Sequence, residues 1–478
     1  MVKKTAILWL RNDFRLKDNK ALIEASKYDQ LIPIFIWDEN LCTEWKVDGA
    51  SKWWLHETLL KFKESLQEKG SDLILFKGST VDEIEKLVKT TSCDVVLWNR
   101  SYNPKESKTV KQLIKKLTNL DVRYESFEGS LLKNPKSLTK SDGTPYLVYT
   151  PFWNNFLKQN QEKILSSPTV LPPLPKNYEH HNTSVENLKI LGKNSWYKKF
   201  HEFWTPGEKE ALRKVSDFLK HKVGQYQSLR DLPHKDGTSC LSPHLHFGEI
   251  HPQRILSLVE KNHGPIAKIK DPSIIQFCKE ILWREFSYHL LQFFPHTTDL
   301  SLKEKFSSFP WRKNKTYFLA WTKGQTGYPI VDAGMRQLWQ TGWMHNRVRM
   351  ISASFLIKHL NVPWQEGAKW FWQTLLDADL ASNTQGWQWT AGCGADAAPF
   401  FRIFNPITQG QKFDPEGNYA RLWCPELSKL PSRWIYSPWL APSEVLIKAG
   451  IKLGENYPKA IVDHKTAREK ALENYKSM

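Results

Sequence analysis

The run Ala6-Ile7-Leu8-Trp9-Leu10 opens the chain, and it is the first of four short apolar segments; the others are 31–37, 73–76 and 95–98. Between them lie stretches such as 53–69, whose apolar residues recur at helical spacing. Strands that alternate with helices indicate βαβ units around a parallel sheet. No Gly-x-Gly-x-x-Gly pattern follows the first run, which argues against an ordinary dinucleotide-binding domain. We therefore expect a Rossmann-like α/β domain over residues 1–132.

The periodicity is lost between residues 133 and 195, where proline and polar residues accumulate. Such a composition predicts an interdomain connector that wraps over the surface. From residue 196 to 478 the pattern is mostly helical and rich in tryptophan, so we expect a large all-α domain that ends in a short charged helix after about 460. Its clearest amphipathic stretches are 208–222, 273–292, 331–360 and 365–378.

The charge balance favours a polyanionic partner. The 478 residues carry a formal net charge of +18, and basic proteins gain sequence-independent affinity for nucleic acid by neutralising phosphates. A lysine-rich surface that merely keeps the protein soluble is the alternative. The six cysteines are scattered without metal-ligand spacing, so we expect no metal site and reduced thiols. No apolar run is long enough for a membrane span, and we expect a cytoplasmic protein.

Three residues with side chains suited to a functional site are spaced so that they lie on one side of a helix: Glu280, Trp283 and Arg284. In a partly dry pocket a carboxyl group favours its neutral form, because the charged form loses hydration. A neutral carboxylic acid can donate a hydrogen bond to a carbonyl group. An exposed glutamate beside a core tryptophan is the alternative that the spacing alone leaves open.

A second group surrounds Trp343-Met344-His345-Asn346-Arg347-Val348-Arg349-Met350. Asn346 and Met350 are one helical turn apart, and Arg349 can reach a carboxylate such as Asp377. An amide reads the edge of a nucleobase or a flavin, and a thioether packs against a flat ring. Taken alone, the pair Asn346 and Met350 is more typical of helix packing; together with the helix around Glu280 and the Asp377 loop, it favours a binding site.

Two further patterns suggest ligand contacts. Trp387 and Trp389 follow Gly386, which indicates a turn where the backbone approaches a ligand and Trp389 provides a stacking platform. Tyr226 and Arg230 precede a hydroxyl-rich turn, Thr238-Ser239-Cys240-Leu241-Ser242-Pro243, just before a helix-like segment. Hydroxyl groups and unpaired backbone N–H groups at a helix start suit a pyrophosphate, although ordinary helix caps have the same composition.

These patterns occur in the order found in the DNA photolyase/cryptochrome family, which the chain resembles over nearly its whole length. The resemblance opens at Trp9-Leu10-Arg11-Asn12-Asp13-Phe14-Arg15-Leu16-Lys17-Asp18-Asn19. It continues through Trp283-Arg284-Glu285-Phe286, Gly327-Tyr328-Pro329-Ile330-Val331-Asp332-Ala333 and Phe401-Arg402-Ile403-Phe404-Asn405-Pro406. It implies an antenna chromophore in the N-terminal domain and a folded, U-shaped FAD in the helical domain.

The resemblance also implies roles for individual residues. Asp377 and Asp379 would hold the ribityl and adenine side of the FAD, Arg349 would pair with Asp377, and Asn383 would face the flavin N5. The residues expected to bind the FAD phosphates are Tyr226, Thr238, Ser239 and Ser242. The residues that match the tryptophan chain for flavin photoreduction are Trp387, Trp364 and Trp311.

The implied substrate is DNA that contains a cyclobutane pyrimidine dimer. Glu280, Asn346 and Met350 match the dimer-repair enzymes, whereas relatives that repair (6-4) photoproducts carry a histidine-bearing version of the motif. Trp283 and Trp389 would enclose the dimer. We expect Arg230, Arg284 and Arg402 to contact DNA.

The segments Ser51-Lys52-Trp53-Trp54-Leu55-His56 and Trp98-Asn99-Arg100-Ser101-Tyr102-Asn103-Pro104 resemble the bacterial class III branch, close to plant cryptochromes. That branch implies 5,10-methenyltetrahydrofolate as antenna, with 8-hydroxy-deazaflavin as the alternative and Glu106 as a candidate contact. We predict a monomeric deoxyribodipyrimidine photo-lyase that uses excited FADH⁻. The alternatives are a cryptochrome-type blue-light receptor, disfavoured by the short C-terminal tail and the dimer-binding residues, and an RNA-binding protein without flavin.

Overall fold

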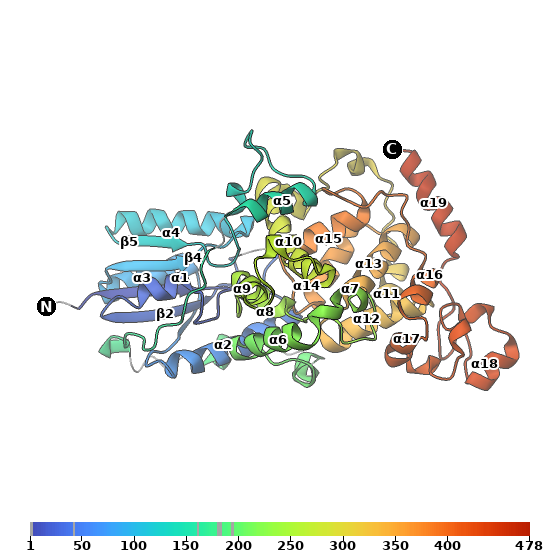
Figure 1. Cartoon of the computed structure of the whole chain (residues 1–478), viewed down its shortest axis with the longest axis horizontal. Helices are drawn as coiled ribbons and strands as arrows, with labels where there is room; N and C mark the ends of the chain where they lie inside the picture. Colours follow the sequence, from blue (N-terminus) through green and yellow to red (C-terminus); the bar gives the residue numbers. More distant parts are fainter. Residues whose placement is uncertain (1–2, 42–43, 160–161, 179–183, 193–195) are drawn as a thin grey trace. The chain divides into compact units, whose positions relative to one another are not determined.

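The computed structural model describes residues 3–41, 44–159, 162–178, 184–192 and 196–478 (Figure 1). The described chain divides into two compact units. One comprises Met1–Tyr146, Thr150–Val223 and Ser239–Phe293, and the other comprises Leu147–Tyr149, Gly224–Thr238 and Phe294–Met478. We call them the first and the second unit. The domain boundaries that composition suggests, at 132 and 195, stay a prediction.

The first unit contains a five-stranded parallel sheet of order β3-β2-β1-β4-β5. In the central strand, Ile7 lies level with Ile32 on one side and with Val96 on the other. The predicted Rossmann-like α/β fold is therefore confirmed. The strands are β1 (Thr5–Leu10), β2 (Gln30–Trp37), β3 (Ile74–Lys77), β4 (Val95–Asn99) and β5 (Arg123–Phe127).

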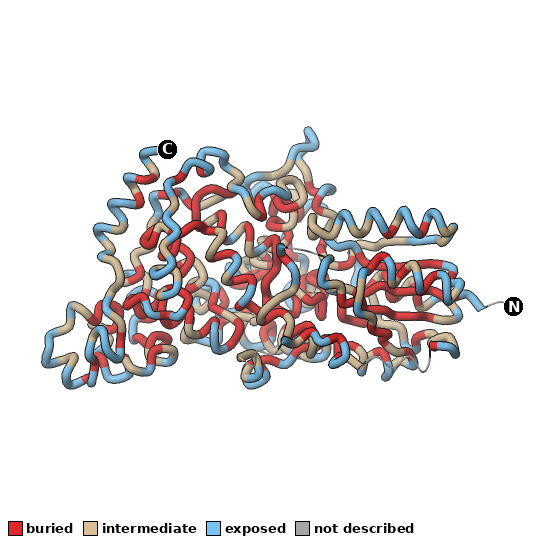
Figure 2. The backbone as a smooth tube through the Cα atoms, turned by 180° about the vertical axis from the view of Figure 1, so that it is seen from behind, coloured by how far each residue is buried: buried red, intermediate tan, exposed pale blue. Residues whose placement is uncertain are grey.

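Apolar side chains on one face of this sheet pack against two helices, α3 (Thr80–Thr91) and α4 (Ser107–Asn119). Ile84 of α3 and Leu113 of α4 are fully buried in that layer. Figure 2 shows the buried strands beside the alternation of buried and exposed turns along α4. The other two helices of the α/β region are α1 (Lys20–Ala25) and α2 (Ala50–Gln67).

The remaining helices of the first unit continue the chain from the sheet. They are α5 (Tyr149–Lys158), α6 (Glu208–His221), α8 (Ser242–His246), α9 (Pro252–His263) and α10 (Pro272–Phe293). The predicted stretches 208–222 and 273–292 coincide with α6 and α10. Helix α5 corrects the picture of an irregular surface connector over 133–195, because Phe152 and Phe156 on α5 are fully buried.

The second unit is helical. Its elements are α7 (Tyr226–Leu229), α11 (Lys315–Thr322), α12 (Pro329–Thr341), α13 (Asn346–Ser354), a π-helix (Phe355–His359), α14 (Trp364–Thr374), α15 (Leu380–Ala391), α16 (Pro406–Phe413), α17 (Asn418–Trp423), α18 (Ser443–Ala449) and α19 (His464–Lys476). The predicted single stretch 331–360 is wrong, because Gly342 adopts a left-handed conformation (φ 67°) and ends α12, after which His345 caps a new helix, α13. The predicted charged C-terminal helix is present as α19.

Candidate functional site

The centre of the candidate site in the second unit is an ion pair. Arg349 Nη2 lies 2.8 Å from Asp377 Oδ2, and Arg349 Nε donates to the backbone carbonyl of Met344 at 2.7 Å. The Asp377 side chain is only 3% exposed. Its other oxygen, Oδ1, is buried and accepts no hydrogen bond from any residue that the structure describes. The predicted pairing is confirmed, and it leaves one buried acceptor for a donor on a bound group.

The chain after Asp377 is held in place by a helix cap. Asp379 caps α15 by accepting a hydrogen bond from Ser382 N at 2.8 Å. Asn383, one turn into the helix, is half-buried, and its Nδ2 donates to the carbonyl of Ala368 on α14 at 3.1 Å. Both predicted cofactor residues therefore have orientations fixed by backbone contacts, which suits a rigid binding surface.

Helix α13 presents the predicted substrate residues. His345 Nδ1 accepts a hydrogen bond from Arg347 N at 3.2 Å and so fixes the start of the helix. Asn346 is exposed in the first turn, and Met350 is half-buried one turn later. Gly334 of α12 allows α13 to approach closely, because a Cβ there would lie 2.3 Å from Val348 Cγ1. Asn346 and Met350 thus lie on one side of a firmly packed helix, as predicted.

The tryptophans around Gly386 correct one prediction. Trp387 and Trp389 do not follow a turn but lie within α15, because the single helical glycine at 386 does not interrupt it. Their side chains still point to different sides, since two residues span about 200° of an α-helix. Trp387 is 2% exposed, whereas Trp389 is half-buried.

The predicted electron-transfer residues differ in their surroundings. Trp364 and Trp387 are buried, and neither indole Nε1 donates a hydrogen bond to a residue that the structure describes. Trp387 packs at 5.0 Å against Phe371. Trp311 is half-buried, and its ring lies 4.2 Å from that of Phe309. The burial of two of the three rings fits a dry path for charge, while the path itself stays a prediction.

The segment Gly224–Thr238 carries two of the residues predicted to bind the FAD phosphates. Tyr226 begins α7 and is buried, and the guanidinium of Arg230 lies 5.5 Å above its ring. Thr238 is half-buried at the end of the segment. Gly237 next to it is required by close packing, because a Cβ would lie 2.6 Å from Leu229 Cβ.

In the first unit, the hydroxyl-rich turn continues into α8 as predicted. Ser239 is half-buried, Ser242 is the exposed first residue of α8, and Cys240 between them has a positive φ of 51°. A positive φ is uncommon for a residue other than glycine. The grouping of these serines with residues of the second unit stays a prediction.

Helix α10 of the first unit carries Glu280, Trp283 and Arg284, all of them half-buried. Glu280 Oε1 accepts a hydrogen bond from Gln276 Nε2 at 2.6 Å. Arg284 donates to the carbonyl of Ser130 at 3.0 Å and contacts Glu285 at 3.1 Å, with its side chain 12% exposed. These contacts show a structural use of Arg284, and its proposed contact with DNA stays a prediction.

Sequence reasoning missed Glu285, although the motif around it was recognised. Its side chain is 3% exposed and accepts a hydrogen bond from Leu132 N at 2.8 Å. Burial raises the pKa of Glu285 to about 7, and the neighbouring Arg284 opposes that rise. No pattern in the sequence distinguishes this carboxyl group from the half-buried Glu280, because its burial depends on the approach of residue 132.

Lys358 in the π-helix was missed as well. It is 2% exposed, and its Nζ donates to the backbone carbonyl of Arg402 at 2.8 Å. Burial lowers the pKa of Lys358 to about 7, and the charge of Arg402 adds to that effect.

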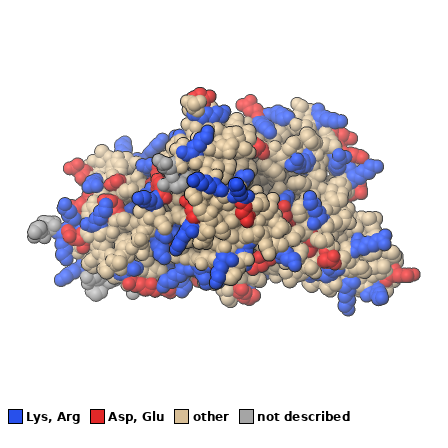
Figure 3. Space-filling view, in the orientation of Figure 1, with Lys and Arg blue, Asp and Glu red and all other residues tan. Residues whose placement is uncertain are grey.

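Arg402 itself is exposed, as a residue that contacts DNA must be. Figure 3 shows further lysine and arginine side chains scattered over the visible face.

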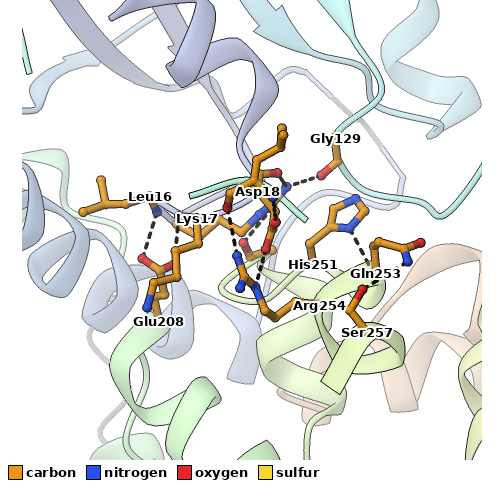
Figure 4. Close-up of polar contacts among 12 residues, drawn as sticks. Leu16, Lys17, Asp18, Gly129, Glu208, His251, Gln253, Arg254 and Ser257 are labelled. Atoms are coloured by element: carbon orange, nitrogen blue, oxygen red, sulfur yellow. Dashed lines mark hydrogen bonds and ion pairs between the residues drawn. The ribbon is translucent and has the colours of Figure 1, made fainter. Parts of the chain in front are cut away.

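The N-terminal motif has a structural explanation. Arg15 is 1% exposed and donates to the carbonyls of Gly248 and Asp18 at 2.9 Å each. Asp18 pairs with Arg254 at 2.7 Å, and Glu208 accepts hydrogen bonds from two backbone N–H groups of the motif (Figure 4). The motif therefore fastens the loop after β1 to helices α6 and α9 within the first unit.

The described ranges contain no group of three or more His, Cys, Asp or Glu side chains arranged to hold a metal ion. They also contain no helix with the length and apolarity needed to cross a membrane.

Comparison with known proteins identifies the family. The family model described as DNA photolyase matches residues 6–175, and the model described as the FAD binding domain of DNA photolyase matches residues 277–477. The chain is 46% identical to a deoxyribodipyrimidine photo-lyase of Agrobacterium fabrum over 99% of this chain and 98% of that protein. The chain belongs to the DNA photolyase/cryptochrome family. The predicted resemblance, with its α/β domain and its helical FAD-binding domain, is confirmed.

Two more relatives refine the placement within the photolyase/cryptochrome family. The crystal structure of a bacterial class III photolyase from Agrobacterium tumefaciens matches with a TM-score of 0.94 at 45% identity, covering 100% of this chain and 98% of that one. Cryptochrome-2 of Arabidopsis thaliana is 37% identical over 98% of this chain and 78% of its own length. The identity to the photolyase is thus the higher of the two.

Proposed function

We propose that the protein is a deoxyribodipyrimidine photo-lyase that repairs cyclobutane pyrimidine dimers in DNA by a light-driven reaction. The observation that carries this proposal is the pair Asn346 and Met350, which share one side of α13 in a chain 46% identical to such an enzyme. An amide beside a thioether offers a hydrogen bond and a soft contact to a flat pyrimidine pair.

The residues of the second unit fit FAD. The buried Asp377 Oδ1 has no donor among the described residues, and Arg349 holds the other oxygen, so the carboxylate is oriented to accept from a bound ring system. Tyr226 and Thr238 would contact the phosphates, and Asn383 would face the flavin N5. Fully reduced FAD, when bound and excited, supplies the electron that opens the cyclobutane ring and receives it back, so the repair has no net redox change.

The protein side chains would bind and polarise the dimer. Glu280 in its protonated form would donate a hydrogen bond to a dimer carbonyl, where negative charge develops when the electron arrives. Trp283 and Trp389, both half-buried, would each offer an aromatic face to a base. Taking the dimer out of the helix costs a few kcal/mol, and least for a damaged base, which contributes to selectivity.

Backbone contacts of DNA would come from the basic surface. We propose Arg230, Arg284 and Arg402 as phosphate contacts, which would give salt-sensitive binding without sequence readout. Arg402 is exposed, whereas the side chains of Arg230 and Arg284 are 17% and 12% exposed. Arg402 is therefore the first of the three to substitute.

The test is repair of a defined thymine-dimer oligonucleotide by the chemically reduced protein, in near-UV or blue light and in the dark, with a (6-4) lesion alongside. We expect light-dependent loss of the cyclobutane dimer alone. A protein that holds reducible FAD and repairs neither lesion would refute the proposal.

That result would favour the second candidate, a cryptochrome-type photoreceptor in which flavin photoreduction is the signal. The 37% identity to Cryptochrome-2 supports it, as do the buried Trp364 and Trp387, which we propose to act with Trp311 as the electron path. The half-life of the photoreduced flavin, measured in air without DNA, tests whether a lasting signalling state forms.

We further propose 5,10-methenyltetrahydrofolate as the antenna, with 8-hydroxy-deazaflavin as the alternative. Glu106, the candidate contact, is engaged by Arg11 at 2.8 Å, and the Arg11 guanidinium lies 4.2 Å above Trp9. Extraction and absorption spectroscopy of the bound chromophore distinguish the two pigments. We also propose a cytoplasmic location, which the free cysteines of the described residues support, and a monomer.

A further inference from the structure

The segment Gly224–Thr238 has an unusual place in the chain. Both neighbours in sequence, Val223 and Ser239, belong to the first unit, but the segment itself packs with the second. It contains most of a 3-10 turn, Val223–Gln225, and the helical turn α7, and it carries Tyr226 and Thr238. Two side-chain contacts tie it to other parts of the second unit.

The first of these contacts is an ion pair to α13. Asp231 Oδ2 lies 2.7 Å from Arg347 Nη2, and the two side chains are 33% and 19% exposed. Arg347 has a second contact that favours one orientation of its side chain, because its guanidinium lies 4.4 Å above the ring of Phe413. A preordered, partly buried guanidinium binds a carboxylate with less loss of entropy than a free one.

The second contact reaches a buried carboxylate. His234 Nδ1 lies 3.3 Å from Asp414 Oδ1. Asp414 is fully buried, and its other oxygen accepts hydrogen bonds from the hydroxyl of Tyr436 and from Ala420 N. The imidazole of His234, 14% exposed, thus faces the side of Asp414 that these two donors leave open. Both contacts come from a stretch of four residues between Tyr226 and Thr238.

We propose that Asp231 and His234 are positioning residues that fasten this segment to the second unit and thereby set how long FAD is retained. The inference rests on the proposed roles of Tyr226 and Thr238 at the FAD phosphates. When the contacts are present, the segment is held in place before the cofactor binds. When they are lost, binding must also order the segment, and that ordering lowers the affinity.

Packing inside the segment links its parts. Gly224 and Gln225 belong to a 3-10 turn, Val223–Gln225, that leads directly into α7. A Cβ at Gly237 would lie 2.6 Å from Leu229 Cβ, so the end of the segment that carries Thr238 packs against α7. The contacts of Asp231 and His234 therefore act on the same packed piece of chain as Tyr226 and Thr238.

The test is the rate of FAD release from the holoprotein, followed by the rise of flavin fluorescence after dilution. We expect about tenfold faster release for Asp231→Asn and for Arg347→Gln. A tenfold change corresponds to about 1.4 kcal/mol. The double variant should release FAD more slowly than the product of the two single effects predicts, because both substitutions remove the same ion pair. Asp231→Asn also loses a 3.8 Å pair with Arg230, and Arg347→Gln also loses the contact with Phe413. Arg347→Lys, which keeps the charge, should restore most of the retention. His234→Asn should give a smaller increase, because its contact is longer.

A matched control is Arg213→Gln, which removes the exposed 2.7 Å pair of Arg213 with Glu210 on α6 and should leave FAD release unchanged. The melting temperature of the FAD-free protein should also stay unchanged in Asp231→Asn. Release at the wild-type rate in Asp231→Asn, or an equal loss of stability without FAD, would overturn the inference. A wild-type protein that retains FAD but repairs no dimer would instead refute the proposed function, and the release assay would still be valid.

Discussion

Gly367 on α14 allows the indole of Trp387 to lie against the helix backbone. A Cβ at this position would lie 2.1 Å from Cη2 of Trp387 and 2.7 Å from Cδ2 of Leu356. Carbon atoms in contact are normally about 3.5–4.0 Å apart, so Gly367→Ala must displace the indole by more than about 1 Å. Trp387 is 2% exposed and packs against Phe371 and Trp321, so it has little room to move.

Overpacking of this kind costs about 1–3 kcal/mol, and alanine gains roughly 1 kcal/mol over glycine in a helix, so the net cost is up to about 2 kcal/mol. We therefore expect Gly367→Ala to lower the melting temperature by up to about 8 °C, given about 2–4 °C per kcal/mol for a unit of this size. The displaced indole should also slow photoreduction of the oxidised flavin, measured under blue light with an external reductant.

The matched control is Gly386→Ala on α15. Gly386 is exposed, and a Cβ there meets no heavy atom within 4 Å, so this substitution should raise stability by about 0.5–1 kcal/mol. Both changes replace a helical glycine with alanine, and only the space around the new methyl group differs. If Gly367→Ala melts at or above the wild-type temperature with normal photoreduction, the packing argument is wrong.

Three further outcomes are expected. Glu280→Ala should keep FAD and lower the yield of dimer repair per absorbed photon, whereas unchanged repair would remove Glu280 from the mechanism. Trp387→Phe should block photoreduction of oxidised flavin but leave repair intact when the flavin is reduced chemically; normal photoreduction would exclude the proposed electron path. Because the folded-state pKa of Glu285 is raised from 4.5 to about 7, the folded protein binds the extra proton between these values, and stability should fall as the pH rises through that window. Glu285→Gln should remove this pH-dependent loss of the free energy of unfolding, which is about 3 kcal/mol at 1.36 kcal/mol per pKa unit. Unfolding experiments from pH 4 to 8 measure it, and an identical pH dependence in the variant would contradict the assignment.

The α/β fold could be predicted because its central strands are continuous apolar runs, as buried parallel strands require. Strand β5 (Arg123–Phe127) could not, since it lies at the edge of the sheet, its first two residues are exposed, and it has no apolar run. The sequence contains a signal for the end of the helix at Gly342, namely a glycine after an amphipathic stretch. The apolar periodicity continues on both sides of that glycine, so the pattern predicted one uninterrupted helix.

Among the site residues, the pair Arg349 and Asp377 could be predicted because the motif places both groups in the sequence with complementary charge. The helical state of Trp387 could not, because local glycine content favoured a turn and the contact with Gly367 is made by a different helix. Glu285 and Lys358 depend on burial by residues far away in the chain, and a sequence pattern does not record that burial.

The interleaving of the two units along the chain has a consequence for synthesis on the ribosome. The first unit needs Ser239–Phe293, so it cannot be completed until residue 293 has left the exit tunnel. By then the segment Gly224–Thr238 has already emerged, although its partners in the second unit, Arg347 and Asp414, have not been made. Each unit therefore waits for a later part of the chain, and no single cut divides the protein into two pieces that each contain all of one unit.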